Sequence, residues 1–97
     1  MKAAICKSDL RELPNIGAET ARLLIEAGIR SAEELRQMGA VAAAARIGAI
    51  RPDDPPCRSM LAGLEGAIRG VRWHIIPQEE REVLWQAYQA ACAAGGP

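Results

Sequence analysis

The chain has 97 residues, with 12 basic and 12 acidic side chains that leave no net charge at neutral pH. This length suits a single domain, which we expect to span residues 1–97 with its core at about 8–93. The balanced charge argues against strong non-specific binding to nucleic acid, because such binding grows with the number of phosphates that a protein neutralises.

The cysteines argue against a disulfide-bonded or zinc-binding protein, and the apolar segments argue against a secreted or membrane-spanning one. Cys6, Cys57 and Cys92 are far apart and form no C-x-x-C pair, so neither a disulfide framework nor a zinc site is indicated. The N-terminus lacks the apolar segment of a signal peptide, and no run approaches the roughly 20 apolar residues of a membrane span. We expect a cytoplasmic protein that uses no membrane, metal or cofactor.

The fold class follows from the residue types. Alanine is abundant and phenylalanine is absent, and β-branched residues never alternate with polar ones over four or more positions. The residue pattern therefore favours helices, and no segment has the alternation that is typical of a strand. We expect an all-α fold, a small bundle of about five helices whose N-terminal half is helix-hairpin-helix-like.

The N-terminal half begins with a hairpin at residues 10–17 that leads directly into a helix. Gly28 follows this helix at the position where a positive φ is needed, so the helix should end there. Ser31 and Glu34 then form a capping box for a second, short helix. The three helices predicted in this half cover about 17–27, 32–38 and 40–50.

The C-terminal half begins after a proline-rich loop at 51–56, which cannot be helical because each proline removes a donor and restricts its predecessor. A long helix is predicted from 56 or 57 to 72. The last helix begins at Pro77, a favoured first position, and fades near 91–94. We expect a frayed tail at 94–97.

The hairpin is the first candidate site. In the usual hairpin a glycine stands at each end of a Gly-apolar-Gly triplet, and here Asn15 replaces the first one because asparagine tolerates the left-handed region. The amides near Gly17, Ala18 and Glu19, together with Arg22, could hold a DNA backbone phosphate. The Glu19 carboxylate opposes this interpretation, and the alternative is a purely structural hairpin.

The helix predicted to end at 72 carries a face with almost no side chain. Each glycine inside a helix costs on the order of 1 kcal/mol relative to alanine, so a close contact should offset these residues. The contact is either packing within the domain, a homodimer interface or a groove for a partner helix. The face consists of Ser59, Gly63, Gly66 and Gly70.

The end of the same helix gathers Arg69, Arg72, Trp73 and His74. Arginines beside an indole can bind phosphates and stack on a base. The alternative is that the cations complement the helix dipole and that the tryptophan covers the edge of the core.

The last helix has an amphipathic pattern, and Trp85 falls off its apolar stripe, where it could anchor a contact. The predicted stripe consists of Val83, Leu84, Ala87, Tyr88 and Ala91.

A catalytic site is not indicated anywhere in the chain. His74 is the single histidine, and no Ser/His/Asp or Cys/His set has positional support. The carboxylates of Asp53 and Asp54 lie in the proline-rich loop, which could not hold a general acid rigidly. We expect that the protein is not an enzyme.

The most specific motif of the chain is the Leu-Glu-Gly-Ala-Ile-x-Gly-x-x-Trp run from Leu64 to Trp73; Leu10-x-x-Leu13, the hairpin, Ala27-Gly28-Ile29 and the segment from Glu34 to Val41 add to it. Together these motifs resemble the C-terminal domain of the TfoX/Sxy family over roughly residues 10–84. The hairpin also resembles the helix-hairpin-helix module at the C-terminus of the RNA polymerase α subunit. Members of the TfoX/Sxy family are associated with natural competence as co-activators beside a DNA-bound transcription factor. The resemblance implies a small helical bundle without enzymatic activity.

We therefore expect a non-catalytic regulatory module that acts through contacts with a protein partner or through self-association. Its predicted packing or dimer face consists of Ser59, Gly63, Gly66, Gly70 and Trp85. The alternative is a DNA-backbone-binding module of weak, sequence-independent affinity. Its predicted phosphate contacts are Asn15, Gly17, Ala18, Arg22, Arg69 and Arg72.

Overall fold

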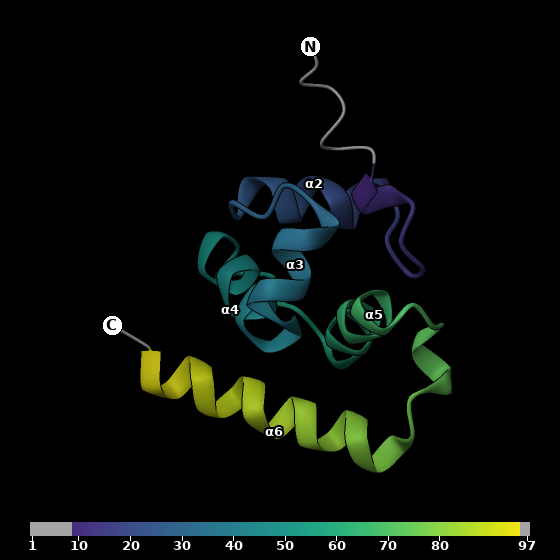
Figure 1. The fold of residues 1–97 in the computed structure, drawn as a ribbon. Coiled ribbons are helices and arrows are strands. Elements are labelled where there is room, and N and C mark those ends of the chain that lie inside the picture. The colour runs from purple at the N-terminus through teal and green to yellow at the C-terminus, as the bar shows by residue number, and fades with distance from the viewer. Residues whose placement is uncertain (1–8, 96–97) are drawn as a thin grey trace.

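The computed structural model describes residues 9–95, and every regular element in that range is helical (Figure 1). This confirms the all-α class. A helical turn ends at residue 11 and precedes the numbered elements. These elements are α2 (Ala18–Glu26), α3 (Ala32–Met38), α4 (Ala40–Ile50), α5 (Arg58–Arg69), the short 3₁₀ helix η1 (Trp73–Ile75) and α6 (Gln78–Gly95).

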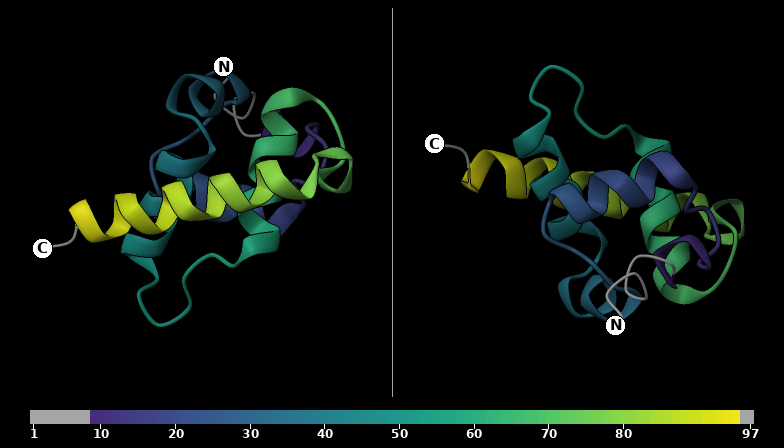
Figure 2. Two further views of the ribbon diagram at one scale, coloured as in Figure 1. Left: turned by 90° about the horizontal axis from the view of Figure 1, so that it is seen from below. Right: turned by 90° about the horizontal axis from the view of Figure 1, so that it is seen from above.

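Helix α4 lies at the centre of the bundle and contacts α2, α3, α5 and α6. Helix α6 runs across one side of the molecule against α4 and α5, and its C-terminal end extends beyond them (Figures 1 and 2). The connection between α4 and α5 stands out from the body as an open loop in both views of Figure 2. No described helix is long and apolar enough to cross a membrane.

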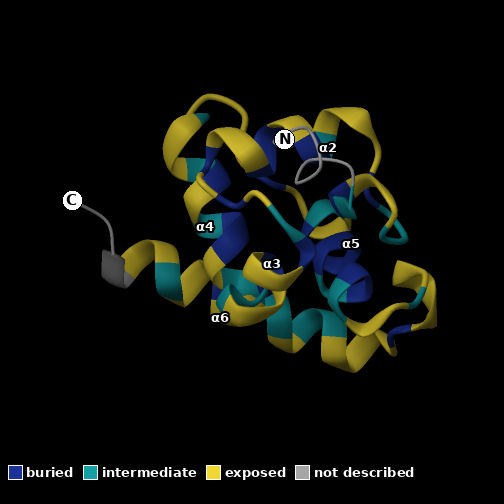
Figure 3. Cartoon of the chain, turned by 45° about the horizontal axis from the view of Figure 1, so that its top comes forward, coloured by how far each residue is buried: buried dark blue, intermediate teal, exposed yellow. Residues whose placement is uncertain are grey.

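The core is built from leucine, isoleucine and alanine, and buried residues are concentrated in α4 and α5 (Figure 3). Alanines along α4 let the neighbouring helices approach closely, so a chain without phenylalanine still fills its interior. No charged side chain is buried in the described part of the chain. The largest fully buried side chains are Leu10, Leu23, Leu24, Ile29, Leu35, Ile47, Leu61, Leu64 and Ile76.

The predicted bounds of α3 and α4 are confirmed, and their end signals act as expected. The Ser31 hydroxyl accepts a hydrogen bond from the Glu34 amide at 3.1 Å. The Glu34 carboxylate accepts from the Arg30 amide at 2.7 Å, one residue before the donor used in a standard capping box. Gly39 separates the two helices with a φ of +88°.

Helix α5 ends at Arg69, three residues before the predicted end at Arg72. Gly70 adopts the left-handed conformation with a φ of +79°, and the Val71 amide bonds back to the Gly66 carbonyl at 2.9 Å. This is the closure that glycine favours at a helix C-terminus. The chain therefore turns before Trp73, which lies in η1 instead of in the long helix.

The predicted apolar stripe of α6 is wrong in part. Val83 is 66% exposed, whereas Tyr88 is 6% exposed and Leu84 and Trp85 pack against the core. The inward face thus includes Trp85 and excludes Val83, because α4 and α5 lie on that side of the helix. Helix α6 continues through Gly95, and residues 96–97 of the predicted frayed tail lie outside the described part.

Candidate functional site

The hairpin before α2 is a series of tight turns. The Glu12 amide bonds to the Asp9 carbonyl and the Leu13 amide to the Leu10 carbonyl, both at 3.2 Å. Asn15 has a φ of +70° and is the one described non-glycine residue with positive φ, which confirms the prediction that asparagine takes a glycine position here. Ile16 is buried and belongs to the core.

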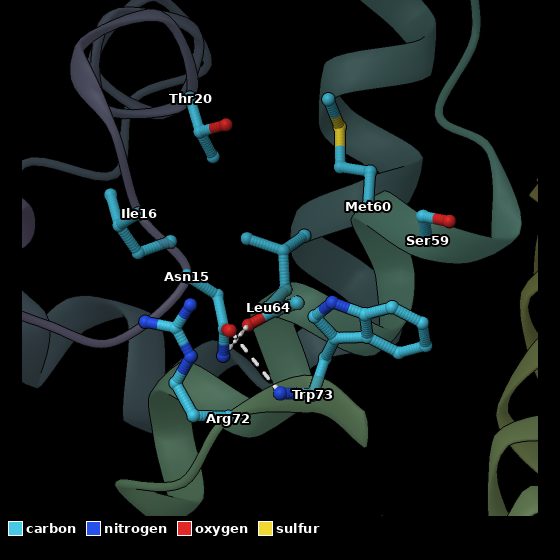
Figure 4. A pocket seen from close by; sticks show the side chains of 9 residues that line it. Asn15, Ile16, Thr20, Ser59, Met60, Leu64, Arg72 and Trp73 are labelled. Carbon is cyan, nitrogen blue, oxygen red and sulfur yellow. Dashed lines mark hydrogen bonds between the residues drawn. The ribbon is translucent and has the colours of Figure 1, made fainter.

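The Asn15 side chain joins this hairpin to the end of α5 (Figure 4). Its Nδ2 donates to the Val71 carbonyl at 2.9 Å and to the Gly63 carbonyl at 3.3 Å. Its Oδ1 accepts from the Trp73 amide at 3.2 Å. Both the Nδ2 and the Oδ1 of this amide therefore hold the hairpin against the end of α5, a role that the local residue pattern does not predict.

The small-residue face of α5 is divided by this contact. Gly63 and Gly66 are buried against Asn15: a Cβ on Gly63 would lie 3.5 Å from the Asn15 Cβ, and one on Gly66 would lie 2.6 Å from the Asn15 Nδ2. Ser59 and Gly70, at the two ends of the face, are exposed. The middle of the predicted groove is thus filled by the chain's own hairpin.

Arg22 lies on α2 between two carboxylates. Its guanidinium contacts Glu19 at 2.8 Å and Glu26 at 2.6 Å. The hydrogen bonds and charge of Arg22 lower the pKa of Glu19, and Glu19 followed by Glu26 raises the pKa of Arg22. Gly17, at the start of α2, has no side chain to cap the helix. Arg22, which was predicted to contact a phosphate, is therefore already paired with two carboxylates.

Arg69 and Arg72, the other two arginines predicted to contact a phosphate, differ in their ion pairs. Arg69 contacts Glu65 at 2.8 Å and Glu80 at 2.9 Å, and these partners raise its pKa. The Arg72 side chain is exposed and forms no ion pair with any residue of the described range. The structure brings Arg72, but not Arg22 or Arg69, to the edge of a pocket beside Asn15.

This pocket, here called the hairpin pocket, has a volume of about 370 Å³ and lies between the start of α2, α5 and the segment that leads into η1 (Figure 4). Its polar groups are Asn15, Thr20, Ser59 and Arg72, and apolar side chains and an indole form the rest of its wall. The apolar side chains and the indole are those of Ile16, Met60, Leu64 and Trp73.

A second hollow of about 640 Å³, here called the proline groove, lies between the loop after α4 and helix α6. Pro52, Pro55 and Pro56 line one side, and Trp85 and Tyr88 line the other. None of its lining residues carries a charge. From the sequence the proline-rich segment is predicted only as a loop, because no local pattern shows that it will face a helix from the end of the chain.

Trp85 and Tyr88 are held in place beside the groove. The Arg58 guanidinium lies 4.9 Å from the centre of the Trp85 ring, and the Trp85 and Tyr88 rings are 5.3 Å apart. Burial, together with the neighbouring Cys92 thiol, raises the pKa of Tyr88 to about 12. Trp85 thus does lie at a hollow surface, although its ring is partly covered by the protein's own side chains.

The described residues contain no group of three or more His, Cys, Asp or Glu that could hold a metal ion. Cys57 and Cys92 are exposed free thiols, and Cys6 lies outside the described range. His74 is exposed and lies edge-on to the Trp73 ring at 6.1 Å.

The sequence matches the TfoX C-terminal domain over residues 6–88. The chain belongs to this family. The matched residues include the hairpin with Asn15 and the whole run from Leu64 to Trp73. The TfoX C-terminal domain is a regulatory type of domain in a family related to competence.

Two solved structures are similar to this TfoX C-terminal domain. Both are proteins of Listeria monocytogenes, one described as uncharacterized in a triclinic crystal form and the other as of unknown function in a tetragonal form. Each is 40% identical to the chain with a TM-score of 0.74 and matches 84% of it, which corresponds to 90% and 98% of the respective Listeria chains. No curated protein matches the chain.

Proposed function

We propose that this TfoX C-terminal domain is a non-catalytic protein-interaction module in transcription or competence regulation, and that it self-associates through the proline groove. The observation that carries the proposal is the groove itself, an uncharged hollow of about 640 Å³ lined by prolines and two aromatic rings. Aromatic side chains and a lack of charge are typical of the centre of protein interfaces.

A second copy is the partner that the groove fits best. The described residues of α6 from Val83 to Gly95 include no charged side chain, and this stretch both lines the groove and extends past α4 (Figure 1). A two-fold interface brings the same patch of both copies together, so it requires a surface on which like charges do not meet. The patch combines a hollow with a protruding helix, which is what a self-complementary interface needs.

The test is the mass of the protein in solution, measured by light scattering over a wide range of concentrations. We expect the mass of the wild-type protein to rise toward that of a dimer. Gln89→Glu places a negative charge in the groove and should leave the protein monomeric. In a two-fold dimer the new carboxylate of one molecule would lie near the same carboxylate of the other, and the two would repel each other. Val83→Glu adds the same charge to an exposed position outside the groove and should behave as wild type.

Two results would reject this assignment. A mass that stays monomeric at every concentration would exclude self-association. Equal effects of Gln89→Glu and Val83→Glu would show that net charge, and not the groove, controls association.

DNA binding is the second candidate function, because the hairpin leads into a helix whose first turn is uncapped. Against it, Arg22 and Arg69 each contact two carboxylates. We expect no binding to duplex DNA at low salt. Tight binding that falls steeply with salt and is lost in Arg22→Ala would favour the DNA module instead.

A further inference from the structure

The hairpin pocket is separate from the proline groove, with which it shares no residue. Its inner wall is apolar, formed by Ile16, Leu64 and Met60 (Figure 4). Its volume of about 370 Å³ is small, so it suits one side chain and not an extended segment. The apolar wall indicates that the occupant has an apolar part.

The Trp73 indole forms a wall that is held from two sides. The Trp73 amide bonds to the Asn15 Oδ1 at 3.2 Å, which fixes the backbone at that point. The Arg81 guanidinium lies 5.2 Å from the centre of the ring, and its Nε donates to the Ile76 carbonyl at 3.0 Å. Although the tryptophan is 37% exposed, it is therefore positioned before any ligand arrives.

Arg72 supplies the polar end of the pocket. Its guanidinium has no carboxylate partner in the described chain, in contrast to Arg22 and Arg69. Thr20 and Ser59 are the other polar side chains at the rim of the pocket, and Figure 4 shows them apart from the Arg72 guanidinium. An arginine beside an apolar hollow matches a ligand that carries one anionic group next to an apolar side chain.

A carboxylate fits these surroundings better than a DNA phosphate. The apolar wall of the pocket would meet a polar sugar if a nucleic acid entered, whereas it can pack against an aliphatic side chain that accompanies a carboxylate. The nearby arginines of α2 and α5 are neutralised by Glu19, Glu26 and Glu65, so a charged backbone that continued past the pocket would meet carboxylates.

We infer that the hairpin pocket binds an apolar residue that bears a free carboxylate, the chemistry of a polypeptide C-terminus. Arg72 pairs with the carboxylate, and the apolar side chain packs against Leu64, Met60 and the Trp73 ring. This site goes beyond the proposed function and does not depend on the proline groove.

The test uses N-acetyl-leucine as the probe and N-acetyl-leucinamide, which has the same side chain without the charge, as its matched control. The two tryptophans of the chain give two indole N–H signals in a ¹H–¹⁵N spectrum, and Trp85 serves as the internal reference because it lies outside the pocket. We expect N-acetyl-leucine to shift the Trp73 signal while the Trp85 signal stays in place. The amide should bind about tenfold more weakly, because it lacks the charge-assisted contact with Arg72.

Arg72→Gln should reduce the affinity for N-acetyl-leucine to that for the amide. Arg36→Gln removes another exposed arginine, on α3, and should leave the affinity unchanged. The spectrum of each variant also shows whether the fold is retained, so a loss of binding can be assigned to the side chain.

Four outcomes would overturn the inference. These are equal shifts with the acid and the amide, equal losses in Arg72→Gln and Arg36→Gln, no Trp73 shift at the solubility limit of the probe, or a stronger shift with inorganic phosphate than with N-acetyl-leucine. The last outcome would assign the pocket to a phosphate group. A failure of self-association leaves this test unaffected, since the spectra are recorded on the protein in either state.

Discussion

Gly66 packs directly against the side-chain amide of Asn15, and no room for a Cβ remains between them. A Cβ on Gly66 would lie 2.6 Å from the Asn15 Nδ2 and 2.6 Å from the Val71 carbonyl oxygen. The second of these atoms belongs to the backbone and cannot move away as a flexible side chain would. The hairpin therefore packs against α5 at a position where a Cβ on residue 66 would require the neighbouring backbone to shift.

Replacing Gly66 by alanine should lower the free energy of unfolding by about 1 to 3 kcal/mol, the usual cost of overpacking. Gly63→Ala is the matched control, because its Cβ would meet the Asn15 Cβ at an ordinary 3.5 Å. That variant should raise stability by up to about 1 kcal/mol through helix propensity. Urea unfolding measures both, and equal effects of the two substitutions would contradict the close contact at Gly66.

Substitutions of Asn15 should lower the stability of the protein through two effects, the loss of its side-chain hydrogen bonds and the strain of its positive φ. Asn15→Gly keeps the positive φ and removes three hydrogen bonds, which should cost about 1 to 3 kcal/mol because the site is half-buried. Asn15→Ala removes the same hydrogen bonds and also places in the left-handed region a residue that tolerates it less well than asparagine or glycine, so it should cost about 1 kcal/mol more than Asn15→Gly. Thermal or urea unfolding of the two variants checks the order; alanine equal to glycine would mean that the φ of +70° carries no strain.

Tyr88 should make the protein less stable at high pH. Its pKa of about 12 exceeds the ordinary value of 10.0, so the folded state holds the proton more tightly than the unfolded state. The full contribution to stability is present below pH 10 and is lost as the pH rises toward 12, by roughly 2 to 3 kcal/mol.

Tyr88→Phe separates this effect from that of the other groups that titrate at high pH. The difference in free energy of unfolding between the two proteins should change between pH 10 and 12 and stay constant below pH 10. A constant difference across the whole range would mean that the tyrosine hydroxyl is not shielded from water.

Removal of the two carboxylates beside Arg22 should create weak DNA binding. Glu19→Gln with Glu26→Gln leaves 10 acidic residues against 12 basic ones and frees the guanidinium at the hairpin. We expect measurable binding to duplex DNA at low salt, with a logarithmic salt slope steeper by about 1 for one added phosphate contact.

The control for this experiment is Glu33→Gln with Glu79→Gln, which changes the net charge equally and leaves Arg22 paired. Fluorescence anisotropy of a labelled duplex measures both proteins. Equal binding by the two double variants would attribute the gain to net charge and not to Arg22.

Local signals were sufficient for much of the fold. Ser31, Glu34 and Gly39 predict the bounds of α3 and α4, because a cap and a positive-φ glycine act on hydrogen bonds within about one helical turn. The end of α5 was missed although Gly70 is also a local signal. A glycine within a periodic apolar pattern is ambiguous, and only the return of the chain toward Asn15 shows that the helix stops there.

The candidate sites depended on contacts between distant segments. The sequence identifies Asn15, Arg72 and Trp73 as residues of interest, but not that they surround one pocket. It also does not reveal that the proline-rich loop faces Trp85 and Tyr88. These contacts between distant segments depend on how whole helices pack against one another, and the periodicity of a single sequence does not predict which helices will be neighbours.

The helical class, most helix bounds, the zero net charge and the resemblance to the TfoX family can be obtained from the amino-acid sequence, because they depend on residue types and on spacings of a few residues. The packing of Asn15 against Gly66, the ion pairs of Arg22 and the outward position of Val83 opposite an inward Trp85 are visible only in the folded chain. Capping and helix propensity act within one turn, whereas the packing of a side chain depends on which distant helix lies opposite it.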